Sequence, residues 1–109
     1  MSHDQQVCHK GYKCDIDYNN NHVLVAIMEG LFPNQDHRKG FKISKSEIDL
    51  IINTAVSLLK MENGEKWCPT EDVEYTKNYG DNNFLLLIIE DFSELLSESS
   101  AEVYHYRNV

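Results

Sequence analysis

The residues that could ligate a metal ion are three cysteines and several histidines. The candidate ligands are Cys8, His9, Cys14, His22, His37 and Cys68. Zinc takes four nitrogen or sulfur ligands, which chains often supply as pairs two to four residues apart. Five residues separate Cys8 from Cys14, and no second cysteine lies near Cys68. The spacing therefore predicts no metal and no other cofactor, and a zinc- or thiol-dependent module is the least favoured interpretation.

A catalytic thiol needs a neighbouring base and surroundings that favour the thiolate. Cys68 stands among acidic residues, which disfavour the thiolate, and Cys14 falls on the apolar side of an alternating segment. Cys8 lies in the polar segment 1–11, which we expect to be loosely ordered. None of these surroundings activates a thiol.

No other catalytic motif can be written from the sequence. Adjacent carboxylates such as Glu71–Asp72 and Glu90–Asp91 lack the apolar surroundings that keep a catalytic acid protonated. The five glycines are isolated, so there is no glycine-rich phosphate loop, and GxSxG and HExxH are absent. We therefore predict a protein without catalytic residues that is not an enzyme.

The formal net charge of −8 is carried by one part of the 109-residue chain. Residues 1–61 hold seven acids and seven bases, whereas residues 62–102 hold eleven acids against two lysines. Such a surface repels nucleic-acid phosphates and anionic membranes. It favours a basic protein partner, whose approach it would accelerate. The alternative is that the charge only keeps the protein soluble.

Aromatic rings are interleaved with the acids of this region. Rings anchor protein interfaces and carboxylates complement basic partners, which is the composition expected of a nucleic-acid mimic. The predicted partner-binding residues are Glu65, Trp67, Glu71, Asp72, Glu74, Tyr75, Tyr79, Asp81, Glu90, Asp91, Glu94 and Glu98. The alternative for the rings is that they cover the core, because Trp and Tyr are usually half buried. The only basic cluster is Arg38, Lys39, Lys42 and Lys45, which would touch a phosphate, an acidic partner or the chain's own acidic half.

These residues must be positioned by a small set of elements. Residues 12–18 alternate apolar with charged side chains, and we predict a β-hairpin in which they pair with residues 22–28. The alternative for the second arm is a helix over 22–31, because Ala26, Met28 and Glu29 favour helices. Residues 40–43 have the composition of a short strand.

Two long helices are predicted from capping and periodicity. Ser44 and Glu47 form a capping-box pattern, and apolar residues recur at helical spacing over 45–62, with Gly64 as a left-handed stop. Residues 70–83 fit a short helix with two tyrosines on one side. Residues 84–89 suit a buried strand or a helix, and we favour a helix over 83–98. Residues 102–107 have strand composition.

The predicted fold class is α+β, with a small antiparallel sheet, made by the N-terminal hairpin and the C-terminal strand, packed against two or three helices. The length suits one domain over 1–109. No apolar leader follows Met1, and three cysteines cannot all pair within one chain, so we expect free thiols and a cytoplasmic location.

The function that these features favour is a small acidic inhibitor that occupies a basic surface of a nuclease or nucleic-acid-binding enzyme, as immunity proteins and phage anti-defence proteins do. Its binding is expected to weaken steeply with salt, and substitutions of Glu71, Asp72, Glu74 and Tyr75 to slow association. The alternative from another class is a non-catalytic subunit or homodimer in which residues 84–96 pack against a second copy.

Overall fold

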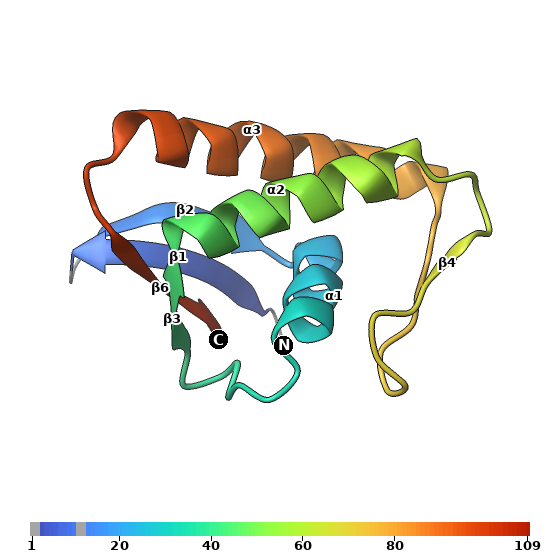
Figure 1. The fold of residues 1–109 in the computed structure, drawn as a ribbon, viewed down its shortest axis with the longest axis horizontal. Helices are drawn as coiled ribbons and strands as arrows, with labels where there is room; N and C mark the ends of the chain where they lie inside the picture. Colours follow the sequence, from blue (N-terminus) through green and yellow to red (C-terminus); the bar gives the residue numbers. More distant parts are fainter. Residues whose placement is uncertain (1–2, 11–12) are drawn as a thin grey trace.

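A four-stranded antiparallel sheet forms one layer of the protein. The computed structural model describes residues 3–10 and 13–109. The strands follow the order β2-β1-β6-β3, with β1 Asp4–Lys10, β2 Lys13–Asn19, β3 Phe41–Ser44 and β6 Val103–Asn108. Three helices pack with this sheet (Figure 1), so the α+β prediction, with its N-terminal hairpin and C-terminal strand, is confirmed.

The N-terminal hairpin differs from the predicted one. β2 pairs with β1, with Val7 opposite Ile16, and Asp4–Lys10 form a strand where the sequence favoured a loosely ordered segment. The pairing of 12–18 with 22–28 is wrong, because His22–Leu31 form the helix α1, the alternative that the sequence left open. The Asn21 side chain caps α1 by accepting a hydrogen bond from the Leu24 amide at 3.0 Å. Tyr12, expected to begin the strand, lies outside the described residues.

The two long helices begin where capping and periodicity predicted. α2 spans Lys45–Lys60, and the Ser44–Glu47 capping box is present. α3 spans Asn82–Glu98, which confirms the helix expected over 83–98. α2 ends before Gly64, whose positive φ of 91° serves the following turn instead of the helix end. The helices run antiparallel side by side over the sheet (Figure 1).

The core lies between the sheet and the helices. Alternate residues of β6 and β3 point inward, so that Tyr104, Tyr106, Phe41 and Ile43 are buried. The helices contribute the remaining large buried side chains, among them Leu24, Ile27, Ile48, Ile51, Leu85, Ile88 and Phe92. No helix of the described residues is long and apolar enough to cross a membrane.

Residues 62–81 form an arm in place of the short helix expected over 70–83. Its two strands are β4 Lys66–Trp67 and β5 Tyr75–Thr76, followed by the 3-10 turn η1 Tyr79–Asp81. Lys77 joins this arm to α2, because its buried ammonium donates to the carbonyls of Leu58 at 2.7 Å and Leu59 at 3.2 Å. A cation that satisfies the last carbonyls of a helix stabilises the helix end.

A disulfide joins Cys8 of β1 to Cys14 of β2. This corrects the expectation that all three thiols are free, because the hairpin places the two residues opposite each other. Cys68 is an exposed free cysteine.

The Lys77 contact predicts a stability effect. Lys77→Met is expected to lower the free energy of unfolding by about 1–3 kcal/mol, because it leaves buried carbonyls without donors. Urea denaturation measures this. The exposed Lys66 is the matched control, and Lys66→Met should change the free energy by less than about 0.5 kcal/mol. Equal stability of both variants would contradict the role assigned to Lys77.

Candidate functional site

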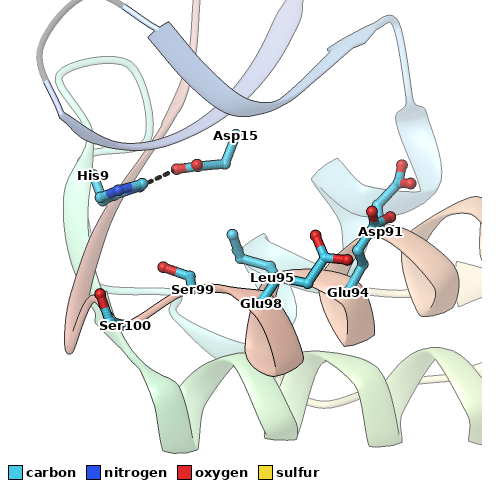
Figure 2. A pocket seen from close by; sticks show the side chains of 8 residues that line it. All are labelled: His9, Asp15, Asp91, Glu94, Leu95, Glu98, Ser99 and Ser100. Carbon is cyan, nitrogen blue, oxygen red and sulfur yellow. Dashed lines mark hydrogen bonds and ion pairs between the residues drawn. The ribbon is translucent and has the colours of Figure 1, made fainter.

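A hollow of about 390 Å³ opens between the β1–β2 hairpin and the C-terminal half of α3. Figure 2 shows the side chains that line it, with the hairpin on one side and the helix on the other. The lining residues are His9, Asp15, Asp91, Glu94, Leu95, Glu98, Ser99 and Ser100. Four of these eight side chains are carboxylates, which makes this hollow acidic.

Irregular strand pairing places the two hairpin residues in the hollow. Val7 pairs with Ile16 and Cys8 with Cys14, so Asp15 has no partner in the ladder. Cys8 then pairs with Cys14 and Lys10 with Lys13, so His9 has none either. An extra residue of this kind is a β-bulge, which redirects a side chain. The two redirected side chains meet, with His9 Nδ1 2.6 Å from Asp15 Oδ2.

The helical side of the hollow follows from spacing along α3. Asp91, Glu94, Leu95 and Glu98 are three or four residues apart and therefore share one side of the helix. Leu95 is 8% exposed and belongs to the core, whereas Glu94 and Glu98 are exposed. The carboxylates thus stand at the solvent boundary above an apolar floor.

Tyr18 of β2 fixes the innermost carboxylate. Its hydroxyl lies 2.7 Å from Asp91 Oδ2 and 3.2 Å from the carbonyl oxygen of Leu87. Burial, followed by the hydrogen bond to Asp91, raises the pKa of Tyr18 well above its usual value. The phenol therefore stays a donor and holds Asp91 in place.

No cationic side chain that the structure describes is bonded to a carboxylate of α3. Among the side chains that the structure describes, which do not include those of Lys10 and Lys13, carboxylates contact basic groups in the pairs His9–Asp15, His22–Asp81 and Lys66–Glu74. Lys45 at the start of α2 donates to the carbonyl of Ser99, just after α3, at 3.3 Å. Such an arrangement can bind an ammonium or a guanidinium group.

The arm holds most of the other predicted partner-binding residues, and there the rings are largely structural. Tyr75 and Asp81 are buried, with the Tyr75 hydroxyl 2.5 Å from Asp81 Oδ2, and His22 Nε2 lies 2.9 Å from Asp81 Oδ1. Trp67 packs against Gly30, where a Cβ would lie 2.6 Å from the ring. Burial leaves Tyr75 and Asp81 no surface for a partner, and of the three rings only Tyr79 is largely exposed.

The exposed acids of the arm lie far from the hollow. Glu65, Glu71, Asp72 and Glu74 are exposed, and the arm lies at the opposite end of the longest axis from the C-terminal end of β1 (Figure 1). Glu74 is held by Lys66 at 3.1 Å. The structure therefore divides the predicted acidic surface into two groups, the second being Glu90, Asp91, Glu94 and Glu98 on α3.

Some residues of the hollow were not singled out as partner-binding by sequence reasoning. His9 and Asp15 reach it only because of the bulges, for which the sequence carries no signal. Ser99 and Ser100 follow the end of α3, and their polarity is ordinary for a loop. The basic cluster is also dispersed, since Lys42 faces outward from β3 while Lys45 contacts Ser99.

No protein-family model matches the chain, and no curated protein or solved structure is significantly similar to it. A functional proposal therefore depends on the residues of this chain alone.

Replacing a helical glycine by alanine is usually harmless or stabilising, but the contact between Trp67 and Gly30 predicts a different result at this position. Gly30→Ala is expected to lower the free energy of unfolding by about 1–3 kcal/mol, because the added methyl overlaps the Trp67 and Pro69 side chains. The emission of Trp67, the single tryptophan, should shift to longer wavelength. Asn53→Ala on the exposed side of α2 is the control. A Gly30→Ala protein with native emission and raised stability would contradict the packing.

Buried tyrosines predict a loss of stability in alkali. Burial first, then a nearby carboxylate, raises the pKa of Tyr18, Tyr75 and Tyr106 above the usual value of about 10. Above about pH 10 the unfolded chain releases these protons and the folded chain retains them, so the free energy of unfolding falls as pH rises. Below that pH the contribution is fully present.

Urea denaturation at a series of pH values above about 10 measures how steeply the free energy of unfolding falls with pH. The Tyr18→Phe protein should show a shallower decline than the wild type, because one of the three groups is gone. Identical slopes would show that Tyr18 ionises alike in the folded and unfolded chain.

Proposed function

We propose that this protein is a small acidic binding protein that docks on a basic surface of a partner protein, with the hollow between the hairpin and α3 as the centre of contact. The partner is a nuclease or another nucleic-acid-binding enzyme, whose phosphate-binding surface is basic. The protein then acts as an inhibitor, in the manner of immunity and anti-defence proteins, by standing where phosphates would bind.

The observation that carries this proposal is the position of the carboxylates on α3. The C-terminal end of a helix carries partial negative charge, and acids there are unfavourable. Glu90, Glu94 and Glu98 are also four residues apart, and each such like-charge pair costs about 0.2–0.5 kcal/mol. The last turn of α3 contains no basic residue. Acids placed where they weaken the free protein are expected at functional sites.

The alternative, a homodimer through residues 84–96, has less support. Leu85, Ile88, Phe92 and Leu95 are already buried in the core of one chain. Only Leu86 and Leu87 of the apolar run are large and exposed, at 51% and 45%. Little apolar surface of this segment is therefore free for a second copy.

The helix charges predict a trade-off between stability and binding. The variant Asp91→Asn/Glu94→Gln/Glu98→Gln should be more stable than the wild type by a few tenths to about 1 kcal/mol, because it removes Glu98 from the negative end of α3 and relieves the like-charge spacing of Glu90, Glu94 and Glu98. The amide oxygen introduced at position 91 would still accept the Tyr18 hydrogen bond. Thermal denaturation at low salt measures the gain, which should shrink as salt is added.

The same variant tests the proposed function. Immobilised wild-type protein is expected to capture a basic protein from a lysate of its native host at low salt and to release it at high salt. The triple variant should not capture it. The matched control, Glu71→Gln/Asp72→Asn/Glu74→Gln, removes the same charge from the arm and should retain capture.

Two results would overturn the proposal. Equal loss of capture by both triple variants would show that only net charge matters. Capture that does not depend on salt would show that the carboxylates do not make the contact.

A further inference from the structure

The face of the sheet turned away from the helices holds a second hollow, of about 360 Å³. Val103, His105 and Arg107 of β6 are exposed, whereas the intervening Tyr104 and Tyr106 are buried. Lys42 of β3 is exposed by the same alternation. The residues that line this hollow include Cys8, His9, Lys42, His105 and Arg107. Its charged side chains are basic, in a protein whose net charge is −8.

The strand register brings these side chains together. Lys42 pairs with His105, and His105 pairs on its other side with Cys8. Directly opposite residues of antiparallel strands point to the same face, with Cβ atoms about 4.5–5.5 Å apart. Arg107 stands two residues further along β6 and therefore on the same face. The sheet thus joins Lys42 to a cluster contributed by residues more than sixty positions later in the chain.

The orientation of two of these groups is fixed within the chain. Arg107 Nε donates to Gln6 Oε1 at 2.8 Å, and no bond from its terminal guanidinium nitrogens is found among the described residues. His105 packs against Gly40, where a Cβ would overlap its ring. Gly40 has a φ of 90°, a backbone conformation that suits glycine. Neither Lys42 nor Arg107 forms an ion pair within residues 3–10 and 13–109.

Strand alternation places two carboxylates on this face of the sheet, Asp4 of β1 and Asp17 of β2, and Asp4 lies further from the hollow than Gln6 does. Asp17 is in the same row of the sheet as Arg107, but Gln6 stands between them and receives the Arg107 hydrogen bond. Asp15, the other acid of β2, points into the acidic hollow beside α3. The polar lining of the second hollow therefore includes two cations outside any ion pair, the imidazole of His105, and the imidazole of His9, which is bonded to Asp15.

We propose that this hollow is a binding site for a phosphate group, held by Arg107, Lys42 and His105. A guanidinium fork, an ammonium and an imidazole N–H are the donors that recognise phosphate oxygens. The proposal does not rest on the docking of a basic protein, since Arg107, Lys42 and His105 lie outside the acidic hollow and bind a ligand of opposite charge; His9 lines both hollows. The ligand is inorganic phosphate or a small phosphate ester such as a nucleoside monophosphate.

Amide chemical shifts of the full chain test this site. Titration with inorganic phosphate is expected to move the amides of β3 and β6 around Lys42, His105 and Arg107 to saturation, while sodium chloride at equal ionic strength does not. Arg107→Gln and Lys42→Gln should each weaken phosphate binding by about tenfold, the effect of one charge-assisted hydrogen bond. Both side chains are exposed, so folding should be preserved.

Lys66→Gln is the matched control, because it removes the same charge from the arm and should leave the affinity unchanged. A second titration, with a nucleoside monophosphate, distinguishes the two candidate ligands, inorganic phosphate and a phosphate ester. If the nucleoside monophosphate binds more tightly than inorganic phosphate, the ligand is a phosphate ester. If the two bind with equal affinity, the ligand is free phosphate. Shifts that chloride reproduces, shifts that do not saturate, or equal weakening by Lys66→Gln would overturn the site.

Discussion

The two ends of the chain are hydrogen-bonded to each other, and the sheet depends on this closure. The Asp4 amide donates to the Val109 carbonyl at 2.7 Å, and the Val109 amide donates to the Asp4 carbonyl at 2.8 Å. β1 and β6 are the two central strands, so β2 is attached only through β1 and β3 only through β6. Both candidate sites depend on this pairing, because it joins the hairpin to the rest of the sheet and places Cys8 beside His105. The contact also joins the most distant parts of the sequence, which favours slow formation during folding.

The acidic residues concentrated in the second half of the sequence do not form one continuous surface in the folded chain. The acids of residues 62–102 separate into an arm, where Glu74 is ion-paired, and a helix face whose carboxylates have no bonded cation among the side chains that the structure describes. The outward face of the sheet carries Lys42, His105 and Arg107. The protein therefore presents surfaces of opposite sign within one small domain. Local electrostatics, more than the net charge, decides which partner each surface attracts.

The helices could be predicted because their signals are local. Ser44 with Glu47 marks the start of α2, and the apolar periodicity of residues 84–96 marks α3. β1 could not be predicted, because its buried Gln5 is stabilised by hydrogen bonds to Asn108 at 2.9 Å and to the Asn21 amide at 2.7 Å instead of by apolar character. Those partners lie far along the chain or in the following turn, and polarity alone suggested a loose segment.

The candidate sites were predictable only in part for the same reason. Glu94 and Glu98 are acids on the exposed side of a predicted helix, which the sequence shows. The position of Asp15 depends on a bulge, and the burial of Tyr75 and Asp81 depends on a hydrogen bond between them. Lys42 belonged to a basic cluster in the sequence, yet its neighbours in the sheet are from β6. The sequence identifies the type of each residue. Which residues become its neighbours in space depends on how the strands pair, and that pairing could not be predicted from local sequence.

The carboxylates beside the hairpin are the surface that we propose meets a partner. Hydrogen–deuterium exchange of the full chain, free and bound to the basic protein it captures, tests this directly. We expect slower exchange in the complex at the C-terminal half of α3, at Ser99 and Ser100, and in the hairpin at His9 and Asp15. Protection confined to the arm around Glu71 and Asp72, with unchanged exchange beside the hollow, would contradict it.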